Sequence, residues 1–157
     1  MGKMFRVIIT LVVIVSGCAV NPLGLLFTAD IDGKPFRAIN GSWDETGLQD
    51  VASGTIFAMD ARFNSFVILV GGAFEEKEYS LELISQDGFS AAATYIDLKN
   101  EKTYVSQSGT LTITSKTDRL TGTFQMTMIG IDDLGGESTL EVTSGEFDLP
   151  NAPGPQI

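Results

Sequence analysis

Leu120-Thr121-Gly122-Thr123-Phe124-Gln125-Met126-Thr127-Met128 is the stretch that decides the fold. Its large apolar residues, at positions 120, 124, 126 and 128, alternate with threonine and glutamine. Successive side chains of a β-strand point to opposite faces, so this period of two indicates a strand with one apolar face. An amphipathic helix would need a period near 3.6 residues instead. The stretch therefore predicts a half-buried strand.

Several other segments alternate in the same way. Leu111 and Ile113 alternate with threonines, and residues 79, 81 and 83 are apolar between polar neighbours. Residues 94–98 place Thr94, Ile96 and Leu98 on one face, with residues 95 and 97 on the other. Residues 66–70 are continuously apolar, which is typical of a strand covered on both faces.

Asp32-Gly33 separates two β-patterned runs, residues 27–31 and 34–38. Asp-Gly favours a type I′ turn, because both central residues of that turn have positive φ. We therefore expect a hairpin over residues 26–39. Because Pro35 has no N–H to donate, its strand should begin there or lie at an edge.

A Ser/Thr-Gly pair recurs in four strand-like segments, at unequal intervals that exclude a propeller or solenoid repeat. The copies begin at residues 53, 108, 121 and 144. Glycine within a strand permits a bulge or a sharp bend. In the last copy the apolar parity changes across Ser144-Gly145, from residues 140 and 142 to residues 147 and 149. One inserted bulge residue would produce that odd step.

Together these segments predict an all-β fold, an antiparallel barrel or sandwich of about seven to ten short strands. Only residues 44–52 could form a helix. In a barrel, Phe124, Met126 and Met128 would line the interior, either as packed core or as the wall of an apolar pocket. The small interior of an eight-strand barrel favours packed core.

The N-terminus predicts export and lipidation. Lys3 and Arg6 precede an apolar run over residues 7–15, which is too short to span a bilayer and is typical of a cleaved signal peptide. Val15-Ser16-Gly17-Cys18 then resembles the bacterial lipobox, an aliphatic residue and two small residues before a cysteine that receives the lipid. The alternative is an ordinary signal peptide cut near Ala19, which leaves Cys18 incidental.

The domain organisation follows from these boundaries. Residues 1–17 form the lipoprotein signal peptide, 18–25 a lipidated tether, 26–149 a single β-domain, and 150–157 a flexible tail rich in proline. Acyl chains on Cys18 would anchor the mature protein stably, because more than one chain is attached.

Composition excludes several classes of function. Removing residues 1–17 leaves 8 basic against 20 acidic residues, a net charge near −12 that opposes binding to nucleic acid. The chain has no histidine and one cysteine, so it lacks Ser-His-Asp machinery, a conventional zinc site and disulfides. We expect no cofactor and no metal, and a membrane contact only through the N-terminal lipid.

Three landmarks resemble an uncharacterised family of small Bacteroidetes-type outer-membrane lipoproteins. They are Phe-Thr-Ala-Asp-Ile-Asp-Gly-Lys-Pro-Phe at 27–36, Ser-Gly-Thr-Leu-Thr-Ile at 108–113 and Ser-Gly-Glu-Phe at 144–147. The resemblance implies a β-rich, calycin-like or sandwich domain tethered to the outer membrane, and it brings no known active site. Residues 19–22 lack the acidic run of surface-exported relatives, which favours a periplasm-facing location over the cell surface.

Trp43 is the best candidate for a ligand-binding residue. It lies beside Asp44 and Glu45 in a polar segment, where an indole could stack on a sugar ring while Asp44 or Glu45 accepts hydroxyl protons. The alternative, which we favour, is that Trp43 folds back to plug the end of the barrel, because a large indole is usually well buried.

Acidic clusters offer weaker candidates. Asp132, Asp133 and Glu137 lie on a glycine-rich segment, but their spacing matches no EF-hand calcium loop. Asp30-Ile31-Asp32-Gly33 begins like a calcium loop, yet Lys34-Pro35 breaks the ligand pattern. Two carboxylates could make a glycosidase, although no pair can be singled out among 20 acidic residues.

The leading hypothesis is a non-enzymatic lipoprotein whose β-domain binds a ligand or a partner protein in the envelope. One alternative is a carboxylate-dependent, carbohydrate-active hydrolase. Another is an envelope assembly or inhibitor protein that offers an edge strand to its partner. A deep concavity with converging carboxylates and Trp43 at its lip would favour the enzyme or a sugar binder. A filled interior with an exposed apolar edge would favour the interaction protein.

Overall fold

The computed structural model describes residues 24–48, 51–82, 90–131 and 136–152. Within these ranges the chain forms nine strands and no helix. The strands are β1 (Leu26–Ile31), β2 (Lys34–Leu48), β3 (Val51–Asp60), β4 (Ser65–Gly71), β5 (Glu78–Ser80), β6 (Ala91–Asp97), β7 (Lys102–Lys116), β8 (Arg119–Ile131) and β9 (Glu137–Pro150). A helix in residues 44–52 is therefore wrong, because 44–48 belong to β2 and 51–52 to β3. Pairing between these two strands overrides the weak local preference.

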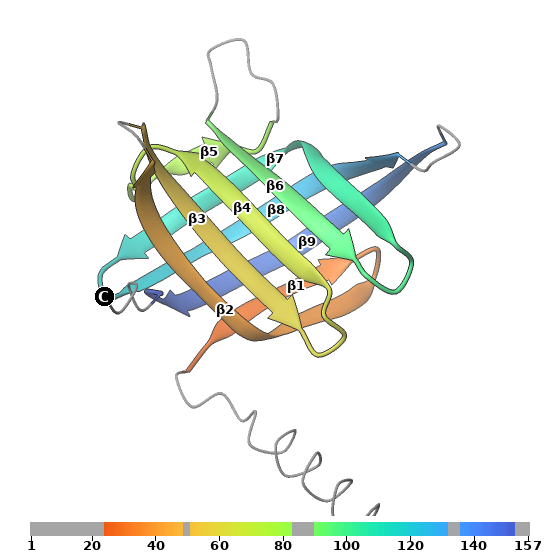
Figure 1. The fold of residues 1–157 in the computed structure, drawn as a ribbon, viewed down its shortest axis with the longest axis horizontal. Coiled ribbons are helices and arrows are strands. Elements are labelled where there is room, and N and C mark those ends of the chain that lie inside the picture. The colour runs from red at the N-terminus through yellow and green to blue at the C-terminus, as the bar shows by residue number, and fades with distance from the viewer. Residues whose placement is uncertain (1–23, 49–50, 83–89, 132–135, 153–157) are drawn as a thin grey trace, which may run out of the picture.

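Eight of the strands close into one antiparallel barrel (Figure 1). The ring runs β1-β2-β3-β4-β6-β7-β8-β9, and β9 pairs back onto β1. The short strand β5 pairs with the second half of β7, beyond the part of β7 that pairs with β6. The all-β prediction is confirmed, and of the two predicted architectures the chain adopts the barrel. Closure gives every ring strand a neighbouring strand on each side, although the β1 ladder covers only the first residues of β2.

The predicted hairpin is confirmed at β1 and β2. Asp32 and Gly33 have φ of 48° and 76°, both positive as a type I′ turn requires. Pro35 lies opposite Asp30 in the ladder with β1. On the other side of β2 the ladder with β3 begins only at Ala38, so Pro35 needs no N–H there.

The predicted bulge in the last strand is also confirmed. Ser144 has a φ of 51°, and the pairing register shifts beside it with both neighbouring strands. Gly145 faces inward after the bulge, where a Cβ atom would lie 2.5 Å from the carbonyl oxygen of Phe124. The buried residues of β9 therefore change parity, from Leu140 and Val142 to Phe147 and Leu149.

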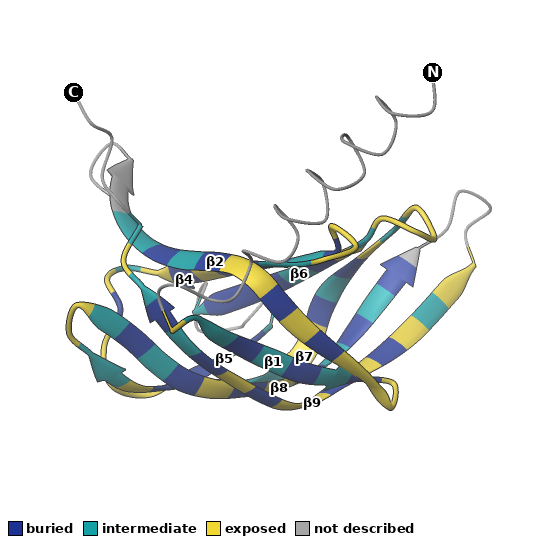
Figure 2. Ribbon diagram, turned by 90° about the horizontal axis from the view of Figure 1, so that it is seen from below, coloured by how far each residue is buried: buried dark blue, intermediate teal, exposed yellow. Residues whose placement is uncertain are grey.

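Side chains fill the interior of the barrel. Buried and exposed residues alternate along the strands (Figure 2). Six aromatic rings pack at the centre with neighbouring centroids 4.7 to 6.3 Å apart: Phe27, Phe36, Phe66, Tyr95, Phe124 and Phe147. Phe124, Met126 and Met128 are all buried. They belong to packed core, as expected for eight strands.

The outside of the barrel has an uncharged face over β3, β4 and β6. Their outward residues are Ser53, Thr55, Phe57, Met59, Ser65, Val67, Leu69, Ala92, Thr94 and Ile96. Tyr95 points inward, so the face of residues 94–98 that carries Ile96 and Leu98 is the outer one. Leu69, Ile96 and Leu98 are 43%, 36% and 55% exposed. Across the barrel, threonine and acidic residues cover the outer positions of β8 and β9.

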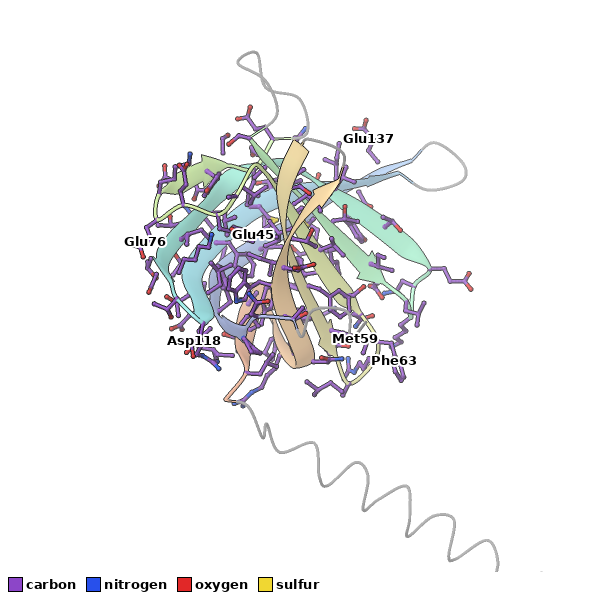
Figure 3. All side chains as sticks on the ribbon, turned by 60° about the vertical axis from the view of Figure 1, so that its left-hand side comes forward. Glu45, Met59, Phe63, Glu76, Asp118 and Glu137 are labelled. Carbon is purple, nitrogen blue, oxygen red and sulfur yellow. The ribbon has the colours of Figure 1, made fainter. Side chains whose placement is uncertain are left out.

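The two ends of the barrel differ. At one end, which we call the base, β1 begins and β9 ends, and Arg119 donates to the carbonyl oxygen of Gly24 and pairs with Asp148. At the other end, the mouth, lie the β1–β2, β3–β4 and β6–β7 turns (Figure 1). Figure 3 shows Phe63 at the mouth, and Glu76 and Asp118 at the base.

Candidate ligand site

Trp43 lies in the core at the base of the barrel. It is 3% exposed, and its ring meets Phe74 edge to face with the centroids 6.0 Å apart. Lys116 Nζ lies 5.9 Å from the indole centroid, and the carbonyl oxygen of Trp43 accepts a hydrogen bond from Ala152. The indole plugs the barrel and has no face free to stack on a sugar.

Asp44 follows Trp43 on β2 and points to the opposite side of the strand, outside the barrel. The structure therefore does not bring these two predicted ligand-binding residues into one site. Of the other sequence candidates, Cys18, Asp132 and Asp133 lie outside the described residues.

Glu45 has a structural role in this segment that the sequence pattern did not predict. A register shift between Ala38 and Asn40 turns Gly41, Trp43 and Glu45 toward the interior. The Glu45 carboxylate accepts hydrogen bonds from the backbone N–H of Phe74 at 2.6 Å and from Lys116 Nζ at 2.5 Å. These contacts hold the 72–77 connection over the base, which makes Glu45 a structural residue.

The candidate site lies at the opposite end, where a pocket of about 280 Å³ opens between the turns of the mouth. Its buried floor includes Phe36, Tyr95, Tyr104 and Leu140. Its polar rim includes Asp32, Lys34, Asp60, Arg62, Asp97 and Lys99. Asp60 and Asp97 occupy inward positions two residues beyond buried Ala58 and Tyr95. Polar residues thus take the inward positions where each strand reaches solvent.

Asp60 builds the β3–β4 turn. Its carboxylate accepts hydrogen bonds from the backbone N–H of Arg62 at 2.8 Å and of Asn64 at 2.9 Å, and from the Asn64 side-chain amide at 3.0 Å. Phe63, between them, has a φ of 66°. Asp97 holds the β6–β7 turn in the same manner, through the backbone and side-chain nitrogens of Asn100. Such side-chain to backbone bonds are typical of aspartate in turns.

The turns of the mouth are tied to their neighbours. Asn64, only 8% exposed, accepts a hydrogen bond from the backbone N–H of Leu98 at 3.1 Å, which joins the β3–β4 and β6–β7 turns. Asp32 bonds Glu141 of β9 twice, with its backbone N–H as donor and its carboxylate as acceptor. The pocket is therefore preformed, which lowers the conformational-entropy cost of binding a ligand.

Two tyrosines form the polar part of the floor. Tyr95 and Tyr104 are 5% and 8% exposed, and their ring centroids lie 6.2 Å apart. Neither hydroxyl makes a hydrogen bond to the rest of the described chain. Burial raises the pKa of Tyr95 to about 12, the carboxylates of Asp97 and Asp60 add to the rise, and Arg62 opposes it. Tyr95 thus remains a neutral hydrogen-bond donor at physiological pH.

The basic residues of the described chain fall into two groups. Lys77, Lys116 and Arg119, toward the base, form ion pairs with acidic residues. Five others form no ion pair within the described ranges, and all lie toward the mouth: Lys34, Arg37, Arg62, Lys99 and Lys102. Three of these five line the pocket. The mouth therefore presents cations whose hydrogen-bonding capacity the fold does not use.

A second hollow of about 520 Å³ lies over β5, β7, β8 and β9, beside the bulge at Ser144. Threonines and the side chains of Glu78 and Glu146 line it. Its polar side chains are solvated surface groups, whereas the mouth combines buried tyrosines with tied turns. The mouth is accordingly the stronger candidate.

Comparison with known protein families, curated proteins and solved structures gives no match. In the ranges described, no group of three or more acidic residues is arranged to hold a metal ion. Nor does that part of the chain contain a helix long and apolar enough to cross a membrane.

The sequence could have signalled this site through one feature. Aspartate appears at an inward position just before a turn in both β3 and β6, as Asp60-Ala61-Arg62 and Asp97-Leu98-Lys99. Each aspartate is followed two residues later by a basic residue. The signal becomes visible only once the inward parity of both strands is known.

Proposed function

We propose that this chain is a non-enzymatic lipoprotein of the cell envelope whose barrel binds a small polar ligand at its mouth. The preformed pocket over a filled interior is the observation that carries the proposal. The pocket offers hydrogen-bond donors that the fold does not use, on turns held together by hydrogen bonds. Packed aromatic rings fill the barrel interior beneath it. Ligand sites commonly combine such buried apolar walls with a few placed polar groups.

The envelope location rests on the sequence alone. Val15-Ser16-Gly17-Cys18 follows a basic and then an apolar segment, and this order supports acylation of Cys18. Labelled palmitate should be incorporated into the wild-type chain and not into Cys18→Ala expressed at the same level. Equal labelling of the two chains would refute lipidation.

Catalysis by the mouth carboxylates is the weaker alternative. A glycoside hydrolase needs one carboxyl group that donates a proton to the leaving group. The Asp60 and Asp97 carboxylates instead accept hydrogen bonds that hold their own turns. Addition of an edge strand to a partner receives less support, because each ring strand already has a neighbouring strand on both sides over part of its length.

Amide chemical shifts test the ligand-binding proposal. Small sugars, anions, amines and zwitterions would be titrated separately into the isotope-labelled full chain in detergent micelles. At least one class should shift the amides of residues 60–64 and 97–100 and leave those of residues 117–119 at the base unchanged. If no class shifts the mouth amides, the proposed function is wrong.

A second candidate function is docking of an envelope protein on the uncharged face of β3, β4 and β6. It is favoured by the absence of charged side chains at the outward positions of these strands, in a chain of net charge −10. A partner docked on this face would meet no outward carboxylate of these strands. A photo-crosslinking residue at Leu69 should then capture one partner in cells, whereas the same residue at Thr123, on the opposite face, should not. Equal capture at both positions would refute it.

A further inference from the structure

We infer that the mouth pocket takes a small zwitterion, in which a primary ammonium group and an anionic group are separated by a few bonds. An α-amino acid and phosphoethanolamine both have this chemistry. The inference rests on the proposed function, because it names the class of ligand for the same pocket.

The aspartates select the ammonium end. Asp60 of β3 and Asp97 of β6 stand at inward positions and line the same pocket as Tyr95. Both carboxylates add to the rise that burial causes in the pKa of Tyr95, on the floor of the same pocket. Each carboxylate retains lone pairs beyond those used in its turn. An ammonium group there would donate to carboxylate and phenol oxygens, as charge-assisted hydrogen bonds favour.

The basic residues select the anionic end. Lys34, Arg62 and Lys99 come from the three separate turns of the mouth and are exposed. None forms an ion pair within the described ranges, so each can turn toward a bound anion. The planar guanidinium of Arg62 can hold a carboxylate or phosphate through two parallel hydrogen bonds.

The balance of charge argues against a ligand with one charge. Three carboxylates and three cations line the same pocket. A simple anion would meet the repulsion of the aspartates, and a simple amine that of the lysines and Arg62. A zwitterion would pair its ammonium group with the carboxylates and its anionic group with the cations. The pocket volume of about 280 Å³ also lies just below the range of drug-sized sites, which suits a small ligand.

Isothermal titration calorimetry of the full chain in detergent tests this inference. Glycine and O-phosphoethanolamine are the zwitterions, and ethanolamine and inorganic phosphate are their single-charge halves. At least one zwitterion should bind tenfold or more tightly than either half. The tighter of the two zwitterions identifies the source as an amino acid or as phosphoethanolamine. If ethanolamine or phosphate binds as tightly as both zwitterions do, the inference is wrong.

Variants locate the two ends of the ligand. Arg62→Gln should weaken zwitterion binding about tenfold, because it removes a charged hydrogen-bond donor. Arg37→Gln is the matched control, since Arg37 is also unpaired and near the mouth but does not line the pocket. Tyr95→Phe should weaken binding of ethanolamine and of the zwitterion alike. Equal affinities of the Arg62 and Arg37 variants would contradict the assignment of the anionic end.

The failures of the two proposals are distinguishable. If glucose shifts the amides of residues 60–64 and 97–100 and neither zwitterion does, the zwitterion inference is wrong and a ligand site at the mouth is supported. If no compound shifts those amides, both proposals fail. Unchanged amide spectra at the base in every variant establish that the barrel remains folded.

Discussion

Asn64→Ala tests whether hydrogen bonds of Asn64 hold the β3–β4 and β6–β7 turns of the mouth together. Asn64 is 8% exposed, and its side chain donates to the Asp60 carboxylate at 3.0 Å and accepts from the backbone N–H of Leu98 at 3.1 Å. The substitution removes two hydrogen bonds worth about 1 kcal/mol each and leaves the Leu98 N–H without its acceptor. We expect the free energy of unfolding to fall by about 2 to 3 kcal/mol.

Asn100→Ala is the matched control for this experiment. Asn100 also bonds an aspartate three residues away, but it is exposed, so water can replace the lost partner. It should lose less than about 1 kcal/mol in urea denaturation. Hydrogen exchange at Leu98 should accelerate only in Asn64→Ala. Losses within about 0.5 kcal/mol of each other would refute the claim that Asn64 ties the two turns.

Three further predictions concern the core and the base. A Cβ atom at Gly122 would lie 2.2 Å from a carbonyl oxygen of β7, so Gly122→Ala should destabilise the barrel by at least about 2 kcal/mol in urea denaturation. Because the pKa of Tyr95 is raised to about 12, its contribution to stability is complete below pH 10 and is lost as pH rises toward 12. Unfolding free energies at pH 9 and 11 should therefore differ less in Tyr95→Phe than in the wild type, and equal differences would contradict the burial argument. Lys116→Met removes the partly buried partner of Glu45 and should lower the free energy of unfolding by about 1 to 2 kcal/mol. Lys77→Met disrupts an exposed ion pair and should change the free energy of unfolding by less than about 0.5 kcal/mol. Equal losses in the two variants would refute this ranking.

Local signals in the sequence predicted local structure well. Asp32-Gly33 marked a turn because few dipeptides accept positive φ twice, and the parity step around Ser144-Gly145 marked a bulge because period-two patterning cannot otherwise shift. The apolar face of residues 120–128 likewise became an inner face. These features depend on neighbours within a few residues.

Features that depend on closure were harder to predict. In β6 the inward apolar residues are two alanines and Tyr95, while Ile96 faces outward. Both faces of the strand therefore carry apolar groups, and patterning does not choose between them. The mouth combines residues from turns that are about 30 residues apart in the chain. Only the order of pairing around the ring brings Asn64 to Leu98. The burial of Trp43 was the favoured expectation from its size, but the register shift in β2 that turns it inward has no signal in its polar sequence neighbourhood.

The opposite placement of the base and the mouth sets how an anchored molecule would stand. Residues 18–25 reach at most about 28 Å when fully extended, and β1 begins at the base. A chain acylated at Cys18 would thus be attached to its leaflet through the base, with the pocket at the end of the barrel farther from the attachment point. The tether would then leave the mouth open to ligands dissolved in the surrounding aqueous compartment.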